Sequence, residues 1–115
     1  MAAARMRKVN EAVREVVSAH IAEDLKDPRI GFVTVTSVDT SPDLRHARVY
    51  VTVLGDDTAR SDAMEGLDSA AGFLQAKLGR ELRMKHTPTL AFHYDGSTDE
   101  GFKIDQLLRE QGGES

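Results

Sequence analysis

The sequence contains no cysteine, and none of its apolar runs is long. Without cysteine the chain forms no disulfide and offers no thiolate as nucleophile or metal ligand, which fits a reducing compartment. No stretch approaches the roughly 18 consecutive apolar residues of a transmembrane helix. The opening residues, MAAARMRKVNEA, hold no apolar core of signal-peptide length. We therefore expect a cytoplasmic protein with no membrane partner.

Aromatic residues are also scarce, at 5% of the chain. For this reason we expect Tyr50 and Phe73 in the core or partly buried, and not as exposed stacking surfaces. The remaining composition, with 40% hydrophobic and 30% charged residues, is that of a folded globular protein. A length of 115 residues suits a single domain, which we expect over residues 1–110, with a flexible tail over 111–115.

Charge is distributed unevenly along the chain, although the formal net charge is only -4. Acidic residues concentrate between Asp56 and Asp68 and again between Asp95 and Glu100. Two basic groups stand apart from them, one at the start of the chain and one near the end of the long central segment: Arg5, Arg7 and Lys8, then Lys77, Arg80, Arg83 and Lys85. This segregation predicts one basic face on an acidic protein.

The first half of the chain reads as a helix followed by a β-hairpin. Apolar residues recur at three- and four-residue spacing over residues 5–25, which predicts an amphipathic helix that ends before Pro28. Residues 30–38 are rich in β-branched side chains, and residues 47–53 alternate strictly between apolar and polar. The turn residues 40–43 separate these two strands.

The segment from 57 to 85 is predicted to hold two helical runs. Asp57 or Thr58 is a candidate N-cap, and Leu67, Leu74 and Leu78 share one face. The runs would meet at Ala70, Ala71 and Gly72, where the missing Cβ of glycine permits a bend or a close backbone approach. Tight packing against the core is the alternative explanation for these small residues.

A third strand is predicted over Thr89–Asp95, followed by a short helical stretch around Ile104, Leu107 and Leu108. The element order therefore predicts an α+β fold in which helices cover one face of a three-stranded mixed sheet. We expect the first two strands to be antiparallel, and the third to lie at the other edge, parallel to the first.

The sequence offers little for catalysis or metal binding. Its four histidines are scattered without the spacing of metal ligands. Asp95, Ser97 and Asp99 form a D-x-S-x-D pattern, but the chain lacks the glycine and the bidentate glutamate of a calcium loop, so we expect a solvated turn. No phosphate-binding glycine loop is present. We expect no catalytic residue, no metal and no cofactor.

The element order resembles that of type II KH domains, which clamp single-stranded RNA with a GXXG loop between helices. This chain has Ala-Ala-Gly at that place. Together with several other segments, it resembles the bacterial ribosome-binding factor A family, in which an A-x-G kink replaces GXXG. The segments that carry the resemblance are Lys26-Asp27-Pro28-Arg29-Ile30, Val33-Thr34-Val35-Thr36, Ser41-Pro42-Asp43-Leu44, Ala47-Arg48-Val49-Tyr50-Val51, Ala70-Ala71-Gly72, Pro88 with Leu90 and Phe92, Asp95 with Ser97, and Gly101 with Ile104 and Leu107.

The resemblance implies a KH-like, non-catalytic and monomeric assembly factor. Such a factor binds the immature small (30S) ribosomal subunit and 16S rRNA, supports late maturation including processing of the 5′ end, and helps growth in the cold. An assembly GTPase as a further partner is left open. The RNA-binding residues would be the two basic groups, Arg5, Arg7, Lys8, Lys77, Arg80, Arg83 and Lys85, beside the kink at Ala70, Ala71 and Gly72.

Two other functions remain as alternatives to RNA binding. A protein-interaction module would add a partner strand to the exposed hairpin edge, and its binding would survive ribonuclease. A small hydrolytic enzyme would use His93 and Asp95, and its turnover would be lost in His93→Ala.

Overall fold

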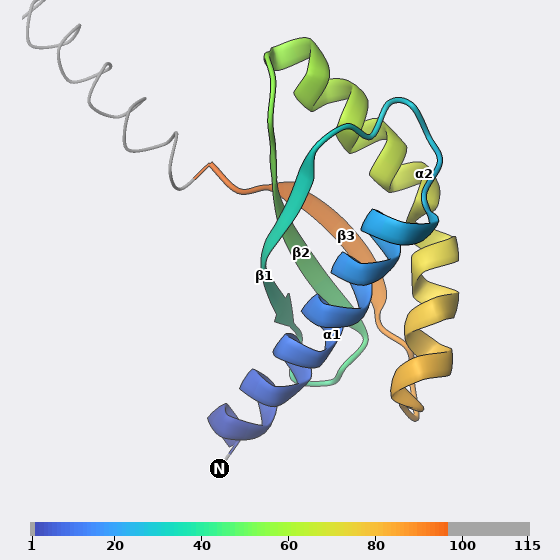
Figure 1. Ribbon diagram of the computed structural model, residues 1–115. Coiled ribbons are helices and arrows are strands. Elements are labelled where there is room, and N and C mark those ends of the chain that lie inside the picture. Colours follow the sequence, from blue (N-terminus) through green and yellow to red (C-terminus); the bar gives the residue numbers. More distant parts are fainter. Residues whose placement is uncertain (1, 97–115) are drawn as a thin grey trace, which may run out of the picture.

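The computed structural model describes residues 2–96 of the chain. Its elements follow the order α1 (Ala2–Asp24), β1 (Val33–Thr40), β2 (His46–Val53), α2 (Asp57–Leu82) and β3 (Thr89–Tyr94). Both helices lie on the same side of a sheet with the strand order β1-β2-β3 (Figure 1). The predicted α+β fold is confirmed. The helical stretch around Ile104 and the tail 111–115 lie outside the described residues.

The core lies between the sheet and the two helices. Alternating side chains of β2, from Ala47 to Val53, are buried, as the strict alternation in the sequence predicts. Val13 and Val17 of α1 close over them together with Leu67, Leu74 and Leu78 of α2, and each of these five residues is at most 1% exposed. This burial holds both helices against one face of the sheet.

The orientation of β3 corrects one expectation. β1 and β2 pair antiparallel, as predicted, but β3 pairs with β2 in parallel, with His46 opposite Thr89 and Val51 opposite Tyr94. It therefore runs opposite to β1. The reason is the length of α2, whose 26 residues return the chain to the end of the sheet where β2 begins.

The segment predicted as two helical runs is a single helix. Asp56 caps it by accepting a hydrogen bond from the Ala59 amide at 2.8 Å, and the helix continues without a break through Ala70–Gly72. Glycine keeps its backbone donor and costs only about 1 kcal/mol in a helix, so it does not by itself end one. The axis nevertheless changes direction where the green part of α2 meets the yellow part (Figure 1).

The glycines of α2 differ in what surrounds them. A Cβ on Gly66 would lie 2.6 Å from Ile30, and one on Gly79 would lie 2.6 Å from the Thr87 hydroxyl. A Cβ on Gly72 would meet nothing within 4 Å among the described residues. Close packing therefore explains Gly66 and Gly79, whereas it does not explain Gly72.

Candidate nucleic-acid interface

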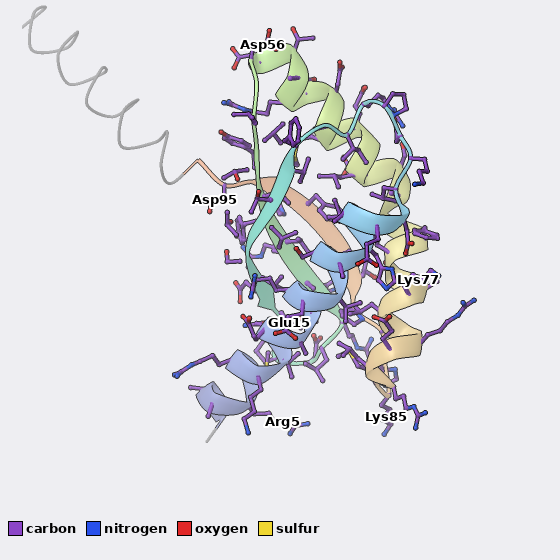
Figure 2. All side chains as sticks on the ribbon, viewed as in Figure 1. Arg5, Glu15, Asp56, Lys77, Lys85 and Asp95 are labelled. Atoms are coloured by element: carbon purple, nitrogen blue, oxygen red, sulfur yellow. The ribbon has the colours of Figure 1, made fainter. Side chains whose placement is uncertain are left out.

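Members of both basic groups lie at one end of the molecule. Arg5, near the start of α1, and Lys85, just beyond α2, both stand at the lower end in Figure 2. α1 and α2 run in opposite directions across the sheet, so the start of α1 and the end of α2 both lie at the lower end of the molecule (Figure 1). They are not adjacent there, because Glu81 contacts His20, which lies about 22 Å along α1 from Arg5.

The predicted RNA-binding cations are distinguished by having no acidic partner. Within residues 2–96, none of the seven forms an ion pair, and all except the half-buried Lys77 are exposed. Arginines elsewhere on the molecule do face carboxylates, as with Arg14 and Glu11 or Arg29 and Asp27. Among the described lysines and arginines, only Lys26 shares the unpaired state of the seven. Unpaired, hydrated cations are the ones available to phosphates.

Lys77 stands apart from the other six. It lies halfway along the molecule in Figure 2, and its Nζ is 5.4 Å from the centre of the Phe73 ring. Phe73 is 44% exposed, so the expected burial of this side chain was wrong, whereas Tyr50 is half-buried as predicted. The positive charge of Lys77 also contributes, behind the hydrogen bond from His20, to holding the pKa of Asp24 below its ordinary value.

Arg83 ends α2 in an unusual backbone conformation. Its φ of 47° and ψ of 41° lie in the left-handed region, which is the common geometry of a helix C-cap but is usually taken by glycine. An arginine there carries a backbone strain of about 1 kcal/mol or more. The chain thus keeps a long cation at a position where glycine would fit more easily.

Three residues near this end were not recognised from the sequence. Arg45, His46 and His86 line an open pocket of about 410 Å³ together with Thr87 and Thr89. The Thr89 amide donates to the Arg45 carbonyl at 2.8 Å and ties the hairpin turn to the start of β3. Only the pairing of β2 with β3 brings these residues together, so no local sequence signal could have found them.

The residues of the predicted kink, Ala70, Ala71 and Gly72, differ in their exposure. Ala70 and Ala71 are partly buried against the core, while Gly72 is exposed. Gly72 precedes Arg80 by eight residues, or about 12 Å along the helix. This region of α2 is therefore open to the close approach of another backbone.

The described residues hold no arrangement typical of a catalytic or metal site. No group of three histidines or carboxylates within residues 2–96 is placed to hold a metal ion. The centres of the His93 and Tyr50 rings lie 5.6 Å apart. Asp95 accepts a hydrogen bond from the Thr36 hydroxyl at 2.6 Å. No helix in this part of the chain is long and apolar enough to cross a membrane.

Comparison with known proteins gives a consistent result. A family model described as ribosome-binding factor A matches residues 5–108. The chain is 49% identical to the ribosome-binding factor A of Geobacter metallireducens over 96% of this chain and 93% of that protein. It is 51% identical to that of Geobacter sulfurreducens over 92% of this chain and 90% of that protein.

Solved structures agree with the sequence comparison. The crystal structure of ribosome-binding factor A from Thermus thermophilus superposes with a TM-score of 0.70 at 28% identity, covering 77% of this chain and 94% of that one. A homology model of the Thermus thermophilus ribosome-binding factor A, fitted into a cryo-EM map of a complex with the 30S subunit, superposes with a TM-score of 0.64 at 29% identity, covering 76% of this chain and 91% of that one. With its fold and these matches in agreement, the chain belongs to the ribosome-binding factor A family.

Proposed function

We propose that this protein binds the immature small ribosomal subunit through 16S rRNA and supports its late maturation, including processing of the 5′ end. The single observation that carries the proposal is the gathering of unpaired cations from α1 and α2 at one end of a family member. A relative fitted into a 30S complex adds support. In this proposal the role is binding and not catalysis.

The cations would act on phosphates and not on bases. Arg5, Arg7 and Lys8 would contact one stretch of the RNA backbone, and Arg80, Arg83 and Lys85 another. Such contacts fix the position of a protein on RNA without reading its sequence. Shape would then provide selectivity, because only RNA strands spaced like the two helix ends can satisfy both groups.

The kink region would provide the close contact. In this proposal the exposed Gly72 lets an RNA backbone or a ribosomal protein lie directly against α2, where a side chain would hold it off. Ala70 and Ala71 would set the direction of the helix on either side through their packing. The seventh cation, Lys77, lies between Gly72 and the basic end and would contact the same ligand.

Further features of the proposal follow from family membership. We infer that the protein acts in the cytoplasm as a monomer, that it matters most for growth in the cold, and that an assembly GTPase is a further partner. Misfolded RNA escapes slowly at low temperature, so a factor that holds the RNA in a productive geometry has its largest effect there.

Co-sedimentation with small subunits from maturing and mature pools, at two salt concentrations, tests the proposal. We expect the protein to pellet with maturing subunits at low salt and to be released at high salt. The variant Arg80→Gln/Lys85→Gln should pellet less, while Arg48→Gln, which removes an arginine facing Asp39 on the sheet, should pellet as wild type does. Equal binding to both pools would contradict a role in assembly, and binding that survives ribonuclease would favour strand addition to a protein partner.

A further inference from the structure

The end of the molecule opposite the basic groups carries two unusually exposed apolar side chains. Phe32 is 78% exposed and Leu54 is 75% exposed. They are neighbours, because the Leu54 amide donates to the Phe32 carbonyl at 3.0 Å. We call this pair the apolar patch. Exposed residues of this size side by side are typical of a surface that another element covers.

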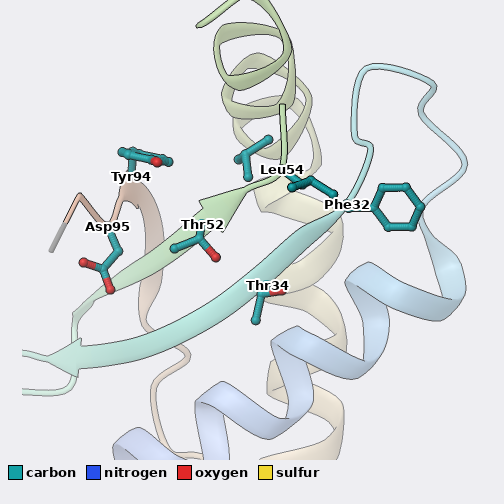
Figure 3. Close-up of a pocket in the computed structure, with 7 residues that line it drawn as sticks. Phe32, Thr34, Thr52, Leu54, Tyr94 and Asp95 are labelled. Atoms are coloured by element: carbon teal, nitrogen blue, oxygen red, sulfur yellow. The ribbon is translucent and has the colours of Figure 1, made fainter. Parts of the chain in front are cut away.

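The apolar patch borders a hollow in the surface. An open pocket of about 460 Å³ lies beside it, with Thr34 and Thr52 at its base and Tyr94 and Asp95 on its far wall (Figure 3). The loop that carries Phe32 is anchored to the core, because the nearby Ile30 packs on Gly66 of α2. The exposure of Phe32 is therefore a property of the folded state.

The chain itself leaves the described structure at this pocket. β3 ends at Tyr94, and the last described residue is Gly96. Five polar or small residues, 97–101, separate Gly96 from Phe102 and can span about 20 Å when extended. The next segment, FKIDQLLR at 102–109, is therefore within reach of Leu54 and Phe32.

That segment is suited to the apolar patch in chemistry and charge. Ile104, Leu107 and Leu108 have the spacing of one helix face. Within 102–109, Lys103 and Arg109 outweigh the single carboxylate Asp105. Asp95 lines the pocket, and Asp56 and Asp57 follow Leu54 by two and three residues along the chain. We call these three carboxylates the acidic rim. The family match extends to residue 108, so this segment belongs to the shared pattern of the family and not to a variable tail.

We propose that residues 102–109 dock on the apolar patch of the same chain, with Phe102 and the three aliphatic residues covering Phe32 and Leu54. Lys103 and Arg109 then face the acidic rim. The docked segment extends the domain beyond β3, at the end of the molecule away from the basic groups.

Disulfide trapping tests this proposal on the full chain, which has no native cysteine to interfere. In the double variant Leu54→Cys/Leu107→Cys at dilute protein concentration, we expect an intramolecular disulfide to form at least tenfold faster than in a control pair. The control is Ala76→Cys/Leu107→Cys, since Ala76 is exposed and lies about 28 Å along α2 from its first residue. Mass spectrometry and non-reducing gels distinguish the products.

Each other outcome overturns the proposal. Equal rates in the two pairs would mean that the segment does not rest on the patch, and disulfide-linked dimers would assign the patch to a second copy. Hydrogen exchange gives an independent measurement without cysteine. Amides 103–109 should be protected in the wild type, and Phe32→Ser/Leu54→Ser should raise their exchange rate at least tenfold while leaving α2 unchanged. Unprotected amides in the wild type would contradict docking.

Discussion

Charged side chains of this protein fall into two groups according to their partners. Arg14 and Arg29 face carboxylates, and the guanidinium of Arg29 holds the pKa of Asp27 below its usual value. The cations at the basic end have no such partner among the described residues. An exposed arginine that already faces an acid has less to gain from a phosphate, so the unpaired group is the better candidate for RNA contact.

Arg83 allows stability and binding to be separated. Because glycine adopts the left-handed conformation without strain, we expect Arg83→Gly to leave the free energy of unfolding unchanged or to raise it by up to about 1 kcal/mol. The same change should weaken binding to small subunits, since it removes one phosphate contact. Urea denaturation and co-sedimentation measure the two effects. Unchanged binding would assign Arg83 to capping alone.

His20 joins the two helices through hydrogen bonds to acids on both sides. Its Nδ1 contacts Asp24 in α1, its Nε2 lies 3.1 Å from Glu81 in α2, and its side chain is 13% exposed. The hydrogen bond to Asp24 raises the pKa of His20 above 6.5, with Glu81 adding to it against the opposing effect of burial. These contacts give His20 a structural role between the two helices.

A raised pKa makes the stability contribution of His20 depend on pH. The charged form is favoured in the folded state, so the contribution is complete below the unfolded pKa of about 6.5 and disappears as pH rises through the folded value. We expect the difference in free energy of unfolding between wild type and His20→Gln to be larger at pH 5.5 than at pH 8.5. Urea titrations at both pH values measure this difference. A difference that does not depend on pH would contradict ion pairing of protonated His20 with Asp24 and Glu81.

At the scale of elements, α2 connects the core to the proposed binding surface. The helix is held to the sheet by Leu67, Leu74 and Leu78, each of which is at most 1% exposed. Gly66 and Gly79 permit its close contacts with Ile30 and Thr87. Gly72 has no such contact within the described residues, so its backbone is free for a partner.

Gly72→Leu should therefore separate folding from binding. Leucine is a better helix former than glycine and its Cβ meets no neighbour there, so we expect the free energy of unfolding to rise by about 0.5–1 kcal/mol. Binding to small subunits should fall because the new side chain blocks close approach. Gly66→Ala is the matched control, and its clash with Ile30 should lower stability. A parallel loss of stability and binding in Gly72→Leu would identify a structural glycine.

The whole molecule is electrically polarised despite its small net charge. Asp56 and Asp95 lie toward one end in Figure 2, while Arg5 and Lys85 lie at the other. In the proposed function, this separation would let an acidic protein approach RNA basic end first, with the acidic end and the apolar patch facing away. Orientation on the subunit would then follow from charge before any specific contact forms.

Salt dependence measures how many phosphates are neutralised. With about four contacts, the logarithm of the binding constant should fall against the logarithm of salt concentration with a slope of about -3 to -4. Arg80→Gln/Lys85→Gln should reduce the magnitude of the slope by about 1.4, because each phosphate contact on a single strand contributes about 0.7, and Arg48→Gln should not change it. Fluorescence anisotropy with a single-stranded 16S fragment provides the measurement. A slope near zero would remove the electrostatic basis of the proposal.

The sequence by itself determined every helix and strand of the described fold to within a few residues, because apolar periodicity and turn residues act locally. It also separated the two basic groups from the acidic ones. Tertiary structure alone decided that β3 runs with β2, that one helix replaces two, and that Arg45, His46 and His86 share a pocket. These features depend on the length of α2 and on strand register, which relate residues far apart in the chain and leave no mark in any short stretch of sequence.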